Sequence, residues 1–279
     1  MKVNYFDLGL YSGVEMKEML YHFFPQIGVT DYSAHGFEAC EVFCDFCRDK
    51  LGDDENVKIH HLAINDKNED VKLYYAKNAL GNSIYKSKNK PYEPRLMDEQ
   101  GTVALDAPGF LIDTKNVNHI QKFFLNHGFE ILKYCVDFKN NSIGDFEIAK
   151  AGEQKRHEVT KGIVFSEWLK NNVPDFKECF NILKINIEGA EYVFFKDIIE
   201  NNLLEHFDVL CGTGHDIEKV PELSNKVEEY KRMLDENGVK IYRFTDWKPE
   251  KNDPLDKIIL EKLRIKMMSK GEQCTFQRT

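Results

Sequence analysis

The chain has 279 residues, a length that suits one large α/β domain better than two small ones. Its formal net charge of −9 argues against binding a nucleic-acid backbone over a broad surface, because such binding needs a dense basic field. It contains no run of about 18 apolar residues, which excludes a membrane-spanning helix. The N-terminal residues lead directly into a predicted strand without room for a signal peptide, so we expect a cytoplasmic protein.

Strands and helices alternate in the first part of the chain. Apolar runs predict strands at Asn4–Leu8, Tyr32–Glu38 and Val57–Leu62. Between them, apolar residues at helical spacing predict a helix that begins after Ser12 and a second helix over Cys40–Leu51. This order favours parallel pairing through right-handed crossovers.

An added antiparallel strand is predicted at Val71–Tyr75, where side chains alternate, and the pattern then breaks. Residues 84–160 are polar and rich in proline, with a predicted helix at Val117–Asn126 and a strand at Phe129–Phe138. We interpret 84–160 as an insertion that covers the ligand edge of a single domain spanning 1–279, because a structureless loop of that length is improbable.

The alternation resumes after the insertion, and its predicted elements are helix Phe165–Asn171, strand Asn181–Ile187, a helix from Ala190, strand Phe207–Cys211, helix Pro221–Asn237, strand Val239–Phe244 and a last element at Lys257–Leu263. The whole pattern predicts an α/β fold with a doubly wound, mostly parallel sheet and one antiparallel strand near its C-terminal edge.

The first predicted strand ends in a D-x-G-x-x-x-G segment formed by Asp7, Gly9 and Gly13. Glycine allows the backbone to approach a ligand closely, and the helix that follows offers free N–H groups to a carboxylate. The second strand ends in Glu38, a position from which a carboxylate can bind both hydroxyls of a ribose. Acids and glycines at neighbouring strand ends predict a nucleotide-like ligand at the carboxyl edge of the sheet.

A later strand runs into the acidic turn Glu188-Gly-Ala-Glu191, which opens a helix. Together with the first segment, this resembles the FkbM-type family of S-adenosylmethionine-dependent methyltransferases, in which a D-x-G-x-x-x-G segment comes first and a K-x-D-x-E-G-A-E segment follows late in the chain. HGFEA around Glu38, HHLAIND at 60–66 and GNSIY at 81–85 resemble further segments of that family. The resemblance covers about 1–85 and 160–245.

The resemblance implies a Rossmann-like methyltransferase fold with seven strands, S-adenosylmethionine as cofactor, and transfer of its methyl group to a hydroxyl oxygen. The implied acceptor is a small molecule or glycan, such as a sugar or related metabolite of surface-glycan or natural-product biosynthesis. A basic stretch in the insertion, Lys86, Lys88 and Lys90, favours an anionic acceptor, for example a phosphorylated one. The implied cofactor-binding residues are Asp7, which would accept from the cofactor's ammonium group, Gly9, Leu10, Gly13, Glu38, Ala63, Ile64, Asn65 and Ser83.

Catalysis is assigned to Asn186, Glu188, Glu191 and His215. The family pattern usually has Asp where this chain has Asn186, and losing that carboxylate argues against a divalent metal, so Asn186 would orient substrate or cofactor by hydrogen bonds. Glu191 lies at a helix N-terminus, where its carboxylate is drawn to free N–H groups. His215 follows the next strand on a glycine-rich loop, and an imidazole titrates near neutral pH, so we predict His215 as the base.

Two alternatives belong to other functional classes. Cys40, Cys44 and Cys47 have a spacing that resembles the cluster motif of radical S-adenosylmethionine enzymes, in which three thiolates hold an iron–sulfur cluster. The same spacing lies along one face of a helix, where small apolar thiols pack well. A protein that binds S-adenosylmethionine without catalysis is the other alternative, which Asn186 keeps open.

Overall fold

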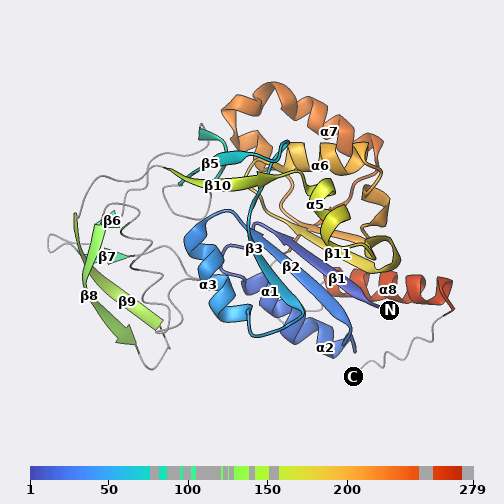
Figure 1. Cartoon of the computed structure of the whole chain (residues 1–279), viewed down its shortest axis with the longest axis horizontal. Helices are drawn as coiled ribbons and strands as arrows, with labels where there is room; N and C mark the ends of the chain where they lie inside the picture. The colour runs from blue at the N-terminus through green and yellow to red at the C-terminus, as the bar shows by residue number, and fades with distance from the viewer. Residues whose placement is uncertain are drawn as a thin grey trace.

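The structure is a computed structural model that describes residues 1–75, 82–86, 121, 125, 157–244 and 254–271, together with the backbone of four strands between 95 and 150. Helices cover both faces of a central sheet (Figure 1). Within the described residues, no helix combines the length and apolar character that crossing a bilayer requires.

The central sheet has six strands, all of them parallel, in the order β13-β12-β11-β1-β2-β3. Its strands are β1 Val3–Leu8, β2 Tyr32–Glu38, β3 Val57–His61, β11 Phe180–Ile185, β12 Val209–Gly212 and β13 Ile241–Tyr242. The doubly wound parallel sheet predicted from the sequence is confirmed. The described part of this sheet contains neither a seventh strand nor an antiparallel one.

The strand order reverses between β1 and β11, which lie side by side at the centre of the sheet. Every residue of both strands is buried, as expected for parallel strands with helices on both faces. Ligands of open α/β sheets bind outside the carboxyl ends of the strands at such a reversal. The fold therefore predicts a ligand site at the turns that follow Leu8 and Ile185.

Two helical layers cover the sheet. One apolar core packs the first layer against the sheet, and a second core does so on the opposite face. The first layer comprises α1 Val14–Glu18, a π-helical turn η1 Met19–Phe23, α2 Phe24–Gln26, α3 Glu41–Leu51 and α8 Pro254–Ser269. The second comprises α5 Phe165–Asn172, α6 Glu191–Glu200 and α7 Val227–Glu236. Short 3₁₀ turns lie at η4 Phe176–Glu178, η5 Leu204–His206, η6 Asp216–Lys219 and η7 Pro221–Lys226.

The first helical segment runs from Val14 to Gln26 and ends before Gly28, which has a positive φ of 72°. Pro25 lies inside this segment, which widens to a π-helix over the preceding residues Met19–Phe23. Proline lacks an N–H and its ring clashes with the carbonyl four residues earlier, so a wider turn accommodates it without breaking the helix.

A small sheet in the order β4-β10-β5 lies near the carboxyl ends of the first central strands (Figure 1). It consists of β4 Ala63–Ile64, β5 Asp70–Tyr74 and β10 His157–Ile163. β5 pairs antiparallel with β10, which confirms the antiparallel strand predicted at 71–75, and β4 pairs parallel with it. The sequence did not predict β10.

A four-stranded antiparallel sheet in the order β6-β7-β9-β8 belongs to the predicted insertion at 84–160. Its strands are β6 Arg95–Leu96, β7 Thr102–Ala104, β8 Phe129–Asp137 and β9 Ser142–Lys150, and β8 confirms the strand predicted from Phe129. The helix predicted at 117–126 lies outside the described residues apart from single positions, so the covering role of the insertion stays a prediction.

Candidate functional site

A hollow that opens to solvent lies at the carboxyl edge of the central sheet, where the strand order reverses. Its volume of about 630 Å³ includes the solvent at its mouth. Seven of the residues assigned from the sequence line it, namely Gly9, Glu38, Ala63, Ile64, Ser83, Asn186 and Glu188. The other lining residues are Tyr11, Phe37, Ala39, Phe43, Leu62, Leu73, Asn82, Ile84, Ile187 and Ala190. Segments far apart in the sequence thus share one cavity, as the strand-end motifs predict.

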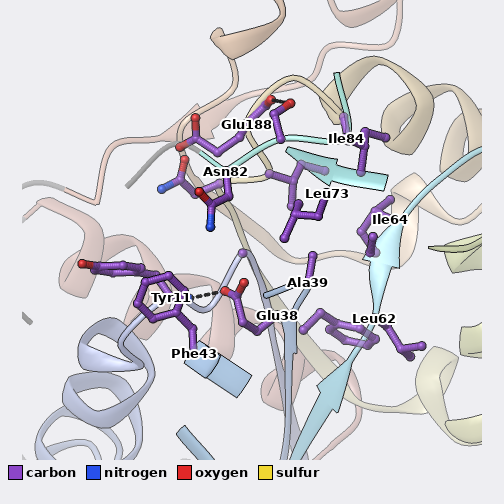
Figure 2. A pocket seen from close by; sticks show the side chains of 17 residues that line it. Tyr11, Glu38, Ala39, Phe43, Leu62, Ile64, Leu73, Asn82, Ile84 and Glu188 are labelled. Carbon is purple, nitrogen blue, oxygen red and sulfur yellow. Dashed lines mark hydrogen bonds between the residues drawn. The ribbon is translucent and has the colours of Figure 1, made fainter. Parts of the chain in front are cut away.

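The hollow has an aliphatic part and a polar part. Figure 2 shows Ile64, Leu73 and Ile84 together at one side, and Glu38 and Asn82 facing the remaining space. A cavity of this kind suits a ligand with one flat apolar ring and one hydroxyl-bearing portion.

Glu38 joins the turns that follow the first two strands. One carboxylate oxygen accepts the N–H of Tyr11 at 2.7 Å and the other accepts the N–H of Cys40 at 2.8 Å. Burial raises the pKa of Glu38 to about 7, although both hydrogen bonds act in the opposite direction. Each carboxylate oxygen can accept a further hydrogen bond, so both remain able to accept from ligand hydroxyls.

Gly9 adopts a positive φ of 81° and lines the hollow, but the requirement for glycine has a different cause from the one expected. A Cβ at Gly9 would lie 1.8 Å from the backbone carbonyl oxygen of Asn186. The close approach is therefore between the turn after β1 and the turn after β11. A side chain at Gly9 would push these two turns apart.

Asp7 does not line the hollow. Its side chain is fully buried beneath the turn formed by residues 9–13 between β1 and α1, which we call the glycine turn. Asp7 Oδ1 lies 2.9 Å from Lys184 Nζ, and the hydroxyl of Tyr5 donates to Asp7 Oδ2. Burial raises the pKa of Asp7, and the neighbouring Lys184 ammonium opposes that shift. A contact between Asp7 and the ligand's ammonium group is thus a prediction that the arrangement of lining residues does not support.

Three other residues assigned to cofactor binding also lie away from the lining. Leu10 is buried in the apolar core, and Gly13, at φ 69°, precedes α1 and packs against Leu51 and Cys47. Asn65 lines a neighbouring hollow that shares Ile84 with the first.

Ser83 holds the segment 82–86 against the turn after β11. Its hydroxyl donates to the carbonyl of Glu188 at 2.7 Å and accepts the N–H of Tyr85 at 3.1 Å. Its backbone pairs with Tyr74 of β5. Because both hydroxyl bonds are made within the protein, Ser83 shapes the hollow more than it offers a free donor.

The assigned catalytic residues are not all brought together. Asn186 and Glu188 line the hollow, whereas Glu191 is fully buried and its carboxylate accepts the N–H of Gly189 at 2.8 Å, as expected at a helix N-terminus. His215 is exposed next to η6 and does not line the hollow.

Backbone strain marks two lining residues. Tyr11 and Glu188 adopt φ angles of 49° and 55°, and among the described non-glycine residues only Asn202 shares a positive φ. Left-handed backbone at bulky residues often accompanies ligand sites. The Tyr11 ring packs on Phe43 with centroids 4.6 Å apart, an aromatic wall that the sequence analysis missed because only the fold brings the two together.

The three cysteines of the alternative motif lie on or next to α3 and are all buried. The Cys47 thiol donates to the carbonyl of Tyr11, and burial raises the pKa of Cys44 to about 12. Throughout the described ranges, no three His, Cys, Asp or Glu residues are grouped so that they could hold a metal ion.

No protein-family model matches this chain, no curated protein matches it, and no solved structure matches it. The assignment of the candidate site therefore rests on its geometry and on the sequence motifs.

Proposed function

We propose that this protein is an S-adenosylmethionine-dependent methyltransferase that methylates a hydroxyl oxygen of a sugar or related metabolite. The observation that carries the proposal is the hollow at the reversal of strand order, with Gly9 and Asn186 on adjacent turns and the Glu38 carboxylate at the next strand end. The resemblance to FkbM-type methyltransferases supports the choice of S-adenosylmethionine over a nucleotide.

The lining residues fit the chemistry of the adenosine moiety. Glu38 would accept from the ribose hydroxyls, which is the role of an acid at this strand end in nucleotide-binding folds. The aliphatic group of Ile64, Leu73 and Ile84 offers a surface for the purine ring. The turn after β1 lacks the G-x-G-x-x-G spacing of dinucleotide-binding folds, which disfavours NAD as ligand.

The cofactor, when bound, supplies an electrophilic methyl group. The protein must hold the acceptor oxygen in line with that group and remove its proton, because a neutral alcohol is a poor nucleophile. Glu188 lines the hollow, whereas His215 is exposed outside it, so we now assign the base to Glu188 and an orienting role to the Asn186 amide.

The acceptor remains a sugar or related hydroxyl compound by resemblance. Lys86 is exposed two residues beyond Ile84, which lines the hollow. A cation so close in sequence to a lining residue favours a phosphorylated or otherwise anionic acceptor.

Calorimetry with S-adenosylhomocysteine and with NAD tests the ligand assignment. We expect binding of S-adenosylhomocysteine at one site per chain and no binding of NAD. Failure of folded wild-type protein to bind either S-adenosylmethionine or S-adenosylhomocysteine at millimolar concentration would contradict the proposal.

Turnover then separates an enzyme from a binding protein. Transfer of labelled methyl groups is measured against a panel of neutral and phosphorylated sugars, with formation of S-adenosylhomocysteine as the readout. Tight binding without transfer to any acceptor would favour the non-catalytic alternative.

A further inference from the structure

Lys184 is a buried lysine in the middle of the sheet, with a side chain that is only 2% exposed. It lies on β11 directly beside Asp7 of β1. Its ammonium group donates to the carbonyl oxygen of Gly9 at 2.8 Å and lies 2.9 Å from Asp7 Oδ1 and 3.2 Å from Glu15 Oε2. The contact with Gly9 is a hydrogen bond, and the contacts with Asp7 and Glu15 are ion pairs to the same ammonium group.

The contacts of Lys184 link four parts of the protein. They connect β11 to β1, to the glycine turn and to the first turn of α1, which carries Glu15. Only the glycine turn among these lines the hollow, through Gly9 and Tyr11. The backbone N–H groups of Gly9 and Leu10 are held from the other side, by the carbonyl of Phe37 on β2. The glycine turn is therefore held from two sides. Lys184 binds its Gly9 carbonyl, and Phe37 of β2 binds its Gly9 and Leu10 N–H groups.

The charges of the cluster require the lysine to be ionised. Burial alone would lower the pKa of Lys184, but the carboxylates of Asp7 and Glu15 raise it. Without the ammonium group, two carboxylates and the Gly9 carbonyl oxygen would converge with no cation between them. Such an arrangement would push the glycine turn away from β11.

We propose that Lys184 is a positioning residue for the ligand site, where its ammonium group fixes the glycine turn over β11 and thereby sets the affinity of the hollow for the adenosine-containing ligand. The ligand named here depends on the proposed function, whereas the fixing of the turn does not. The residue acts through Gly9 and does not itself line the hollow.

The decisive variant keeps the buried charge balanced. Lys184→Met alone leaves a buried carboxylate uncompensated and can fail to fold, so the test uses Asp7→Asn/Lys184→Met, which removes one positive and one negative charge. The matched control is Asp208→Asn/Lys266→Met. The Lys266 ammonium group donates to the carboxylate of Asp208 and to the carbonyl of Cys179, each at 2.7 Å. Neither of these two residues lines the hollow.

We expect the Asp7→Asn/Lys184→Met protein to unfold cooperatively but to bind S-adenosylhomocysteine at least tenfold more weakly than wild type, with the control variant within twofold. Hydrogen exchange gives a readout that needs no ligand. The amides of Gly9, Leu10 and Gly13 should exchange at least tenfold faster in this variant, while those of α6 are unchanged.

Unchanged protection at Gly9, Leu10 and Gly13 would overturn the inference, as would wild-type affinity in the charge-balanced variant. If wild-type protein bound no S-adenosylhomocysteine, the proposed function would fall, and the exchange rates would still decide whether Lys184 positions the turn.

Discussion

The carboxylate of Glu38 accepts the backbone N–H of Tyr11 at 2.7 Å, and this contact fastens the end of the second strand to the turn after the first. Tyr11 needs such support because its backbone lies in the left-handed region at φ 49°. The same carboxylate faces the hollow, so one side chain both shapes the site and offers acceptors to a ligand.

The ionisation of Glu38 should make ligand affinity depend on pH. Burial raises its pKa to about 7, so the free protein holds a largely neutral Glu38 at pH 6 and a largely ionised one at pH 8. Ribose hydroxyls donate to the ionised form, so affinity for S-adenosylhomocysteine should rise about tenfold from pH 6 to pH 8. Calorimetry across this range measures the change.

Glu38→Gln separates this effect from other titrations, including that of Asp7. The variant should bind about 10- to 100-fold more weakly at pH 8, since a hydrogen bond to a charged group is lost, and its affinity should vary little with pH. Glu55→Gln, at an exposed position, is the control and should behave as wild type. A pH dependence that persists in Glu38→Gln would assign the titration to another group.

Gly9 should be the least replaceable glycine of the described residues. Ala at this position would place its Cβ 1.8 Å from the Asn186 carbonyl oxygen, so we expect Gly9→Ala to lower the free energy of unfolding by more than about 4 kcal/mol. Gly238 also has a positive φ but has no atom within 4 Å of the corresponding Cβ position. Gly238→Ala should therefore lower the free energy of unfolding only by the penalty of a left-handed alanine backbone, about 1–2 kcal/mol. Chemical denaturation compares the two; equal losses would refute the carbonyl clash.

Glu188 and His215 give opposite expectations for the base. Because Glu188 lines the hollow and His215 is exposed outside it, Glu188→Gln should reduce methyl transfer by roughly 10²–10⁴ with nearly unchanged affinity for S-adenosylhomocysteine. His215→Ala should retain turnover within a few-fold of wild type. The reverse outcome, measured with the true acceptor, would restore the histidine predicted from the sequence.

The purified protein should carry no iron–sulfur cluster. Cys40, Cys44 and Cys47 are buried, and burial raises the pKa of each thiol, which opposes the thiolate form that a cluster needs. Anaerobic reconstitution followed by iron and sulfide analysis should give background values. Stoichiometric iron that disappears in Cys44→Ala would instead favour the radical enzyme.

Methyl transfer should continue after treatment with a chelator. Asn186 supplies a neutral amide at the position where a carboxylate would attract a divalent cation. Turnover is compared before and after treatment with EDTA and dialysis. Loss of activity that Mg²⁺ restores would show that a metal acts at the site despite Asn186.

Elements with a strong local pattern could be predicted from the sequence alone. The strand Tyr32–Glu38 has the predicted limits, and α3 begins one residue after its predicted start, because apolar spacing and turn residues are local properties. The strand β10 was not predicted because its sequence HEVTKGI is largely polar and contains no apolar run. It becomes a strand through pairing with β4 and β5, which come about ninety residues earlier in the chain.

The sequence by itself determined the alternation of strands and helices, and it indicated which strand ends carry acids and glycines, because parallel strands place their carboxyl ends at one edge. Only the tertiary structure decided what each of those residues contacts. Lys184 is one polar position in an apolar strand until β1 pairs beside it and brings the Gly9 carbonyl, 175 positions away, within 2.8 Å. Likewise, Asp7 is turned into that buried cluster while Glu38 faces the hollow, since side-chain direction and burial follow from packing between distant segments.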